Sequence, residues 1–158
     1  MRRPLSFLGF LIVFMSLLPT PCRAEKVILT IEQSQRFTEI ENQLVTPGEG
    51  RIFLGLLVAI KNTSDKIIDG GSEDPHATFR LETVNGYTIP AENTSSDAWR
   101  KNRMVWATQE IMPGEIKRGW LIFTIPKDDS PSQLIFDVAE KTGPYSSLLL
   151  GRNRIPVR

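Results

Sequence analysis

The acidic stretch around Asp69 carries residue types that could bind a metal ion. Asp69, Glu73 and Asp74 lie close together beside two glycines, and His76 follows them. Carboxylate oxygens are the ligands that Ca²⁺ prefers, and the ion takes about six to eight of them. The stretch lacks the spacing of an EF-hand loop, so a solvated acidic loop explains it more simply. A Ca²⁺ site at Asp69, Glu73 and Asp74 that stabilises the domain is kept as the alternative interpretation.

A basic segment further along the chain has the residue types of a binding surface. Trp99 is followed by Arg100, Lys101 and Arg103. Trp and Arg are enriched at the positions that dominate the energetics of protein interfaces. We therefore expect Trp99–Arg103, called the basic segment below, to contact an unknown envelope protein or an anionic cell-wall polymer. The alternative is a solvated loop with Trp99 packed beneath its edge.

Catalytic and cofactor chemistry has little support in this sequence. His76 is the only histidine and Cys22 the only cysteine, so a zinc site of four Cys or of paired Cys and His is impossible, as is a CxxC redox pair. A hydrolase would need a nucleophile beside His76, and the sequence has no G-x-S-x-G turn that presents a serine. We expect no enzymatic activity and no cofactor, and keep a hydrolase as the third interpretation.

Length, composition and charge limit the class of protein further. The chain has 158 residues, of which 41% are hydrophobic and 23% charged, and this suits one globular domain. The formal net charge is +1. Because a nucleic-acid-binding domain normally carries a far more basic balance, we expect no nucleic-acid partner.

The first 24 residues have the three-part layout of a secretory signal peptide. Arg2 and Arg3 give a positive start, residues 5–18 form an apolar run, and Ala24 is a small residue at the cut. The apolar run is shorter than the ~20 residues that span a bilayer. We therefore expect residues 1–24 to be removed and residues 25–158 to form an exported domain, periplasmic or extracellular, with no transmembrane segment.

Cys22 raises the question of a lipid anchor. Bacterial lipoprotein signals require a small residue before the cysteine, and this chain has Pro21 there. We therefore do not expect anchoring at Cys22. A mature chain that begins at Glu25 has no cysteine, so its apolar core must hold the fold without a disulfide.

The exported part is dominated by strand signals. Apolar residues alternate with polar ones, and Asn85-Gly86 and Pro113-Gly114 are typical turn pairs. The expected strands cover residues 27–31, 51–62, 78–84, 87–89, 104–111, 116–126, 134–138 and the tail at 147–150 or 155–157. This pattern predicts an all-β, antiparallel β-sandwich of about seven to nine strands. The spacing of Phe37, Ile40 and Leu44 leaves a short helix at residues 35–44 as a minor alternative.

Three expected strand and turn positions make specific packing predictions. In residues 116–126, Leu121, Phe123 and Ile125 share one face, while Trp120 and Ile122 share the other. Gly119 indicates a bulge or a close neighbour, and Trp120 is expected to fill the space between sheets. Residues 51–62 are apolar on both faces, which is typical of a central strand, and Asn62 is expected in the turn that ends it.

Three segments resemble a known family. Residues 50–66, 79–89 and 111–128 have its hydrophobic strand ending in Lys-Asn, its Phe-x-Leu strand with an Asn-Gly hairpin, and its Pro-Gly-Glu turn followed by Gly-Trp. The family is a domain of unknown function common in bacterial lipoproteins, similar to a small secreted mycobacterial immunoprotective antigen. The resemblance covers about residues 27–138 and implies an exported immunoglobulin-like sandwich with no established enzyme activity.

These inferences together predict what the protein does. We expect an exported, immunoglobulin-like β-sandwich that acts as a monomeric or weakly associating binding module in the bacterial envelope, with a ligand that the sequence does not name. The predicted contact residues are Trp99, Arg100, Lys101 and Arg103.

Overall fold

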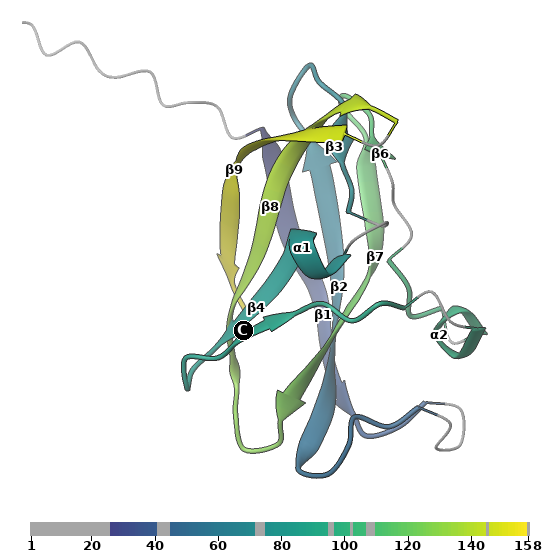
Figure 1. Cartoon of the computed structure of the whole chain (residues 1–158), viewed down its shortest axis with the longest axis vertical. Coiled ribbons are helices and arrows are strands. Elements are labelled where there is room, and N and C mark those ends of the chain that lie inside the picture. The colour runs from purple at the N-terminus through teal and green to yellow at the C-terminus, as the bar shows by residue number, and fades with distance from the viewer. Residues whose placement is uncertain are drawn as a thin grey trace, which may run out of the picture.

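The computed structural model describes residues 26–40, 45–71, 75–94, 97–101, 103–106, 110–144 and 146–157. Within them, nine strands form two antiparallel sheets, and two short helices, α1 (Pro75–Thr78) and α2 (Asp97–Lys101), lie outside the sheets. The sheets face each other as the two layers of a sandwich (Figure 1). The predicted all-β sandwich of about seven to nine strands is confirmed.

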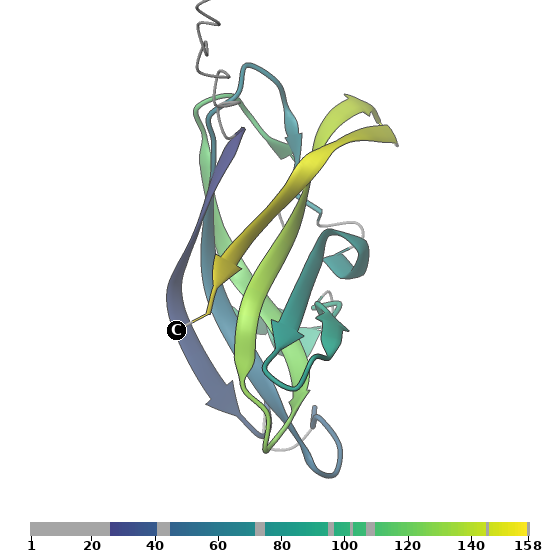
Figure 2. The same cartoon turned by 90° about the vertical axis from the view of Figure 1, so that its left-hand side faces the viewer.

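The smaller sheet has three strands in the order β1-β2-β7. Its members are β1 (Val27–Phe37), β2 (Arg51–Asn62) and β7 (Ile116–Pro126). The larger sheet has six strands and the order β5-β4-β8-β3-β6, with β9 on the other edge of β8. Its members are β3 (Ile68–Asp69), β4 (Phe79–Thr83), β5 (Thr88–Pro90), β6 (Glu110–Ile111), β8 (Pro131–Gly143) and β9 (Ser146–Pro156). Figure 2 shows the two layers from the side.

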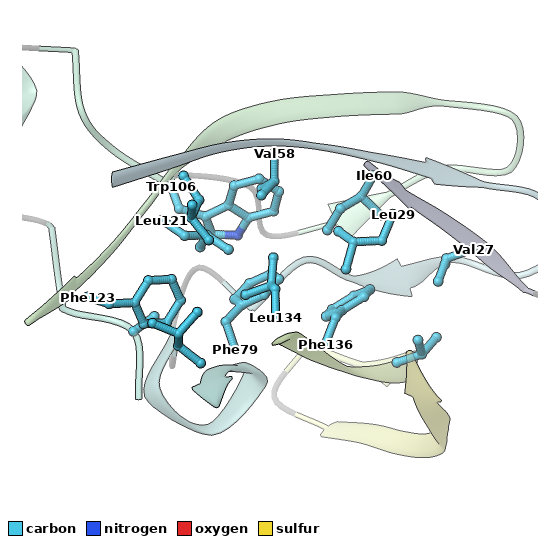
Figure 3. Packing of buried hydrophobic residues seen from close by; sticks show 14 of the residues in the cluster. Val27, Leu29, Val58, Ile60, Phe79, Trp106, Leu121, Phe123, Leu134 and Phe136 are labelled. Carbon is cyan, nitrogen blue, oxygen red and sulfur yellow. The ribbon is translucent and has the colours of Figure 1, made fainter. Parts of the chain in front are cut away.

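The main core fills the space between the sheets. Phe79 stacks on Phe136 with a centroid distance of 5.0 Å, and Trp106 meets Phe79 edge-on at 5.2 Å (Figure 3). β2 supplies Leu54, Leu56, Val58 and Ile60 from its inner face. These side chains are removed from water, and such burial is the dominant favourable term in folding. The prediction that β2 is a central strand covered on both faces is confirmed, because Phe53 on its outer face is buried as well.

Gly119 marks the closest approach of another chain segment to β7. A Cβ at this position would lie 2.6 Å from the Trp106 ring, so only glycine fits. Trp106 therefore lies between the sheets, and its ring N–H donates to the carbonyl of Gly70 at 2.5 Å. The expected close neighbour of Gly119 is confirmed. The expectation that Trp120 fills the space between sheets is wrong, because Trp120 points outward, as does Ile122 in the same strand.

The two turn predictions are confirmed. β4 and β5 pair as a hairpin, and Gly86 in its turn has a φ of 86°. At the second turn, Gly114 has a φ of 78°, and the N–H of Glu115 donates to the carbonyl of Met112 at 3.0 Å. The Glu115 carboxylate accepts the Met112 N–H in return and pairs with Lys117 at 2.6 Å. The hydrogen bond from Lys117 is the main reason that the pKa of Glu115 lies below its usual value.

Asn62 ends β2 with a side chain that is fully buried. Its amide nitrogen donates to the carbonyls of Lys66 at 2.6 Å and Ile111 at 2.8 Å. Its amide oxygen accepts both the N–H and the hydroxyl of Ser64, at 2.9 and 2.7 Å. One side chain thus holds the turn after β2 and joins it to β6, as expected for a turn residue with a complete set of partners.

Two expected elements differ from the structure. Residues 35–37 continue β1 and Ile40 bridges to Val45, so the described part of the 35–44 stretch is not helical. Of the expected strand at 104–111, only Glu110–Ile111 is a strand, and residues 107–109 lie outside the described residues. Met104–Trp106 instead crosses the edge of β7, where the Trp120 N–H donates to the carbonyl of Val105 at 3.0 Å.

The predicted signal peptide, residues 1–24, lies outside the described residues. Among the residues that the structure describes, no helix combines the length and the apolar character needed to cross a membrane.

Candidate functional site

The basic segment packs on the outer face of the three-stranded sheet. The cluster beneath it consists of Ile40, Phe53, Trp99, Met104 and Ile122, all buried. Trp99 is 5% exposed and meets Phe53 edge-on with a centroid distance of 5.3 Å. Trp99 therefore anchors the segment to the sheet, and its indole is not part of the exposed surface.

A helix-ending motif fixes the shape of the segment. The N–H of Met104 donates to the carbonyl of Trp99, and the N–H of Arg103 donates to the carbonyl of Arg100, both at 3.0 Å. This pair of bonds is the Schellman arrangement, in which a left-handed residue follows the helix and an apolar contact closes the turn. Arg103 is that residue, with a φ of 57°, and Met104 and Trp99 form the apolar contact.

The anchored segment presents two arginines to solvent. Arg100 and Arg103 are exposed, and neither forms an ion pair with another residue that the structure describes. Lys101 belongs to α2, but its side chain lies outside the described residues. The guanidinium groups are thus available for a carboxylate or phosphate group, which they bind through parallel hydrogen bonds.

The acidic stretch is described only in part. The carboxylate of Asp69 accepts the N–H of Gly71 at 2.9 Å with one oxygen and the hydroxyl of Ser147 with the other. Glu73 and Asp74 lie outside the described residues, as does the side chain of His76. Within the described ranges, no three His, Cys, Asp or Glu side chains come together as metal ligands. Nothing described here favours the Ca²⁺ interpretation or the hydrolase.

Two basic residues near the C-terminus, Arg152 and Arg154, have partners within the fold. Asp137 on β8 binds both Arg80 on β4 and Arg152 on β9, the latter at 2.6 Å. Arg154 on β9 binds Glu82 at 3.0 Å. The hydrogen bond that Arg152 donates to the Asp137 carboxylate raises the pKa of Arg152 above its usual value. These arginines therefore hold the edge strand β9 against the sheet.

Sequence reasoning missed the parts of the site that depend on tertiary contacts. Met104 was expected in a strand, but it follows the basic segment and packs with Trp99 in the cluster on the outer face of the sheet. The left-handed conformation of Arg103 had no signal in the sequence, because glycine or asparagine normally marks such a position. The cluster of Trp, Arg and Lys residues was the only available signal for the segment itself.

By its fold and its surface, the molecule is a small antiparallel β-sandwich domain that carries two exposed arginines on an anchored loop. The chain belongs to the family described as Domain of unknown function (DUF4352), whose model matches residues 19–147. The expected membership of a family of unknown function is thereby confirmed. Secretion and the relation to the mycobacterial antigen stay predictions.

Several solved structures are similar to the chain. The yjhA protein from Bacillus subtilis is 16% identical over 71% of this chain and 74% of its own, with a TM-score of 0.49. A conserved hypothetical protein from Bacillus anthracis is 18% identical over 83% and 89%, with a TM-score of 0.46. An uncharacterized beta-sandwich protein from Clostridium difficile 630 is 16% identical over 80% and 85%, with a TM-score of 0.40. No curated protein matches the chain.

Proposed function

We propose that the protein is an exported, monomeric and non-catalytic binding module of the cell envelope. Its contact surface is the basic segment, and its partner is an anionic protein or an anionic cell-wall polymer. The signal-peptide pattern of residues 1–24 supports the proposed export. Arg100 and Arg103 carry the contact, Lys101 adds a third cation, and Trp99 holds the segment in place from beneath.

The observation that carries this proposal is the arginine at a left-handed position. For a residue with a side chain, this conformation costs about 1–2 kcal/mol. Glycine avoids that cost and is the usual residue there. The chain holds Arg103 at a φ of 57° instead. An unfavourable residue at a surface position is explained when its charged group is used outside the domain.

The anchoring beneath the segment supports binding by a fixed surface. Trp99 and Met104 are buried, and the two Schellman hydrogen bonds hold the backbone between them. A partner that binds an already ordered segment does not have to order it, so less affinity is lost to entropy. The charged ends of Arg100 and Arg103 are then the groups that desolvate on contact.

The test is the capture of an anionic partner from an envelope extract with Arg103→Gly as the key variant. The protein purified from expression of the full chain serves as the bait. Because glycine relieves the left-handed strain, Arg103→Gly is expected to raise the melting temperature by a few degrees. Because it removes a cation, it is expected to lower capture several-fold. Stability and capture thus change in opposite directions, which excludes unfolding as the cause of lost binding.

Three controls complete this experiment. Arg103→Lys keeps a cation and is expected to retain part of the capture, whereas Arg100→Ala is expected to lose it. Arg51→Ala removes an exposed cation from the outer face of the same sheet, away from the entry end, and is expected to change nothing. Capture should also fall as salt rises, since exposed charges are screened. Full capture by an Arg100→Ala/Arg103→Gly variant would show that the contact surface lies elsewhere.

A further inference from the structure

The exposed large apolar side chains gather at one end of the sandwich. The end of the sandwich where β1, β7 and β9 begin and where β2 and β8 end is called the entry end (Figure 1). Among the described residues, seven large apolar side chains are exposed, and five of them lie at the entry end. They are Ile28 (47% exposed), Met112 (49%), Ile116 (45%), Leu148 (59%) and Leu149 (64%). The other two, Val84 and Tyr87, belong to the β4–β5 hairpin, outside the entry end. Scattered apolar residues need no explanation, but a concentration at one end indicates a contact surface.

One part of this surface is a row across the three-stranded sheet. Ile28 on β1 lies opposite Lys61 on β2, and Lys61 lies opposite Ile116 on β7. Residues opposite one another in antiparallel strands point to the same face of the sheet. All three are exposed, so a lysine stands between two isoleucines on the outer face. A lysine stem covers apolar surface while its ammonium reaches water or a polar headgroup.

The other part is the hairpin of β8 and β9, which projects from the sandwich (Figure 2). Leu150 packs against the main core, whereas Leu148 and Leu149 before it do not. The hydroxyl of Ser147 donates to the carboxylate of Asp69, so the hairpin is held in place beside β3. Two adjacent leucines on a supported, projecting hairpin present apolar surface on both of its faces.

Four of the charged groups at the entry end form two ion pairs, while Lys61 forms none with another residue that the structure describes. Lys117 pairs with Glu115 at 2.6 Å, and Lys66 pairs with Glu140 at 3.9 Å. Exposed pairs of this kind leave little net charge for a distant partner. The apolar side chains are therefore the main contact groups of the entry end, and the Lys61 ammonium can reach a polar headgroup beside them.

We propose that the entry end contacts the lipid surface of a membrane. The described fold begins at Lys26, and the apolar run at residues 5–18 ends eight residues before it, a distance of at most ~28 Å in extended chain. This step rests on the proposed export: before residues 1–24 are cleaved off, residues 5–18 lie in the membrane, and the entry end is the part of the described fold next to the bilayer. After cleavage, the apolar side chains of the entry end maintain the contact without this tether. Exposed Leu and Ile side chains then enter the boundary between headgroups and acyl chains.

The test is cosedimentation with vesicles of phosphatidylcholine, a lipid without net charge. The protein is the exported form, purified from cells that express the full chain. The native protein is expected to bind. The double variant Leu148→Ser/Leu149→Ser is expected to lower the partition coefficient by about tenfold, since two apolar side chains no longer leave water. Both side chains are more than half exposed, so the variant is expected to keep the fold.

The matched control is Val84→Ser/Tyr87→Ser, which removes the exposed apolar residues outside the entry end and is expected to bind as the native protein does. Binding is also expected to persist at high salt and in Arg103→Gly, which separates this surface from the basic segment. The proposal is overturned if the native protein does not bind, if the leucine variant binds equally well, or if both double variants lose binding alike. If the protein binds vesicles but captures no anionic partner, the membrane contact of the entry end is supported and only the proposed function is refuted.

Discussion

Asp129 is a buried carboxylate in the turn between β7 and β8. It is 2% exposed, and its Oδ1 accepts the N–H groups of Ser130 at 2.7 Å and Asn85 at 3.3 Å. Burial by itself raises the pKa of Asp129. The hydrogen bonds from Thr83, Ser130 and Asn85 together outweigh burial, so the pKa lies below its usual value. The carboxylate thus ties the β7–β8 turn to the β4–β5 hairpin in its charged form.

Asp129 is expected to make the stability of the fold sensitive to acid. Because its folded pKa is lower than its unfolded pKa, the stabilisation is complete above the unfolded value of about 4 and is lost as the pH falls through the folded value. Asp129→Asn should lower the free energy of unfolding at neutral pH. It should also flatten the loss of stability below about pH 4. Urea titrations between neutral and acid pH measure both effects.

The neighbouring residue supplies the control for this prediction. Asp128 is exposed beside Asp129, so Asp128→Asn removes the same charge without the buried hydrogen bonds. An acid response of Asp129→Asn equal to that of the native protein would contradict the assignment.

At the scale of elements, the central feature is the crossing of β7 by residues 91–94, 97–101 and 103–106. Glu92 donates its N–H to the carbonyl of Ile122 at 2.7 Å, and Val105 accepts the N–H of Trp120. This crossing covers the free edge of β7, which would otherwise expose unpaired backbone groups. It also places Trp99 on the outer face of the sheet and Trp106 on the inner face.

Gly119→Ala tests the close approach of this crossing. The added Cβ would lie 2.6 Å from the Trp106 ring and 3.0 Å from the Val105 carbonyl. Forced displacement of a packed ring typically costs about 1–3 kcal/mol, so the free energy of unfolding should fall by that amount. Gly151→Ala in β9 is the control, because no atom lies within 4 Å of its added Cβ. A denaturant titration that finds equal stability for both variants would refute the packing argument.

The strands were predictable where their residues alternate. Leu121, Phe123 and Ile125 do face the main core, and Ile122 faces away, because a strand must place successive side chains on opposite faces. The turns at Gly86 and Gly114 were predictable because glycine adopts positive φ without strain. These features are local, so a single sequence contains them.

The crossing was not predictable, because it depends on contacts between residues that are far apart in the sequence. Trp106 enters the core against Gly119, and this contact joins two segments that no strand or turn pattern in the sequence relates. The basic segment was recognisable from its composition, but its anchoring by Trp99 and Met104 depends on a sheet face assembled from distant residues. Contacts of this kind have no period in the sequence.

At the scale of the whole molecule, the three-stranded sheet is covered on its inner face and on part of its outer face. The main core lies on its inner face, and the cluster of Phe53, Trp99 and Ile122 lies on its outer face. The basic segment and the entry end are separate parts of this molecule, since α2 lies beside the sandwich and the entry end lies at its tip (Figure 1). An envelope partner and a membrane could therefore be contacted at the same time.

The proposed export makes a direct prediction about the mass of the protein. Cleavage after Ala24 would leave a chain that begins at Glu25, one residue before the first described residue. Mass spectrometry of the exported protein is expected to find this chain without a lipid on Cys22. Ala24→Arg removes the small residue at the cut and should leave the precursor uncleaved. A diacylated species that begins at Cys22 would instead identify a lipoprotein.

The burial of Asn62 has a consequence for where the protein can be made. Asn62-Thr63-Ser64 is an acceptor sequence for N-linked glycosylation, which eukaryotic secretory pathways attach as the chain emerges. A sugar on the Asn62 amide nitrogen would occupy the donor that binds Lys66 and Ile111, in a place with no exposed surface. A glycan on Asn62 and the native fold therefore exclude each other. The domain is expected to fold only in cells, or in compartments, that leave Asn62 without a glycan.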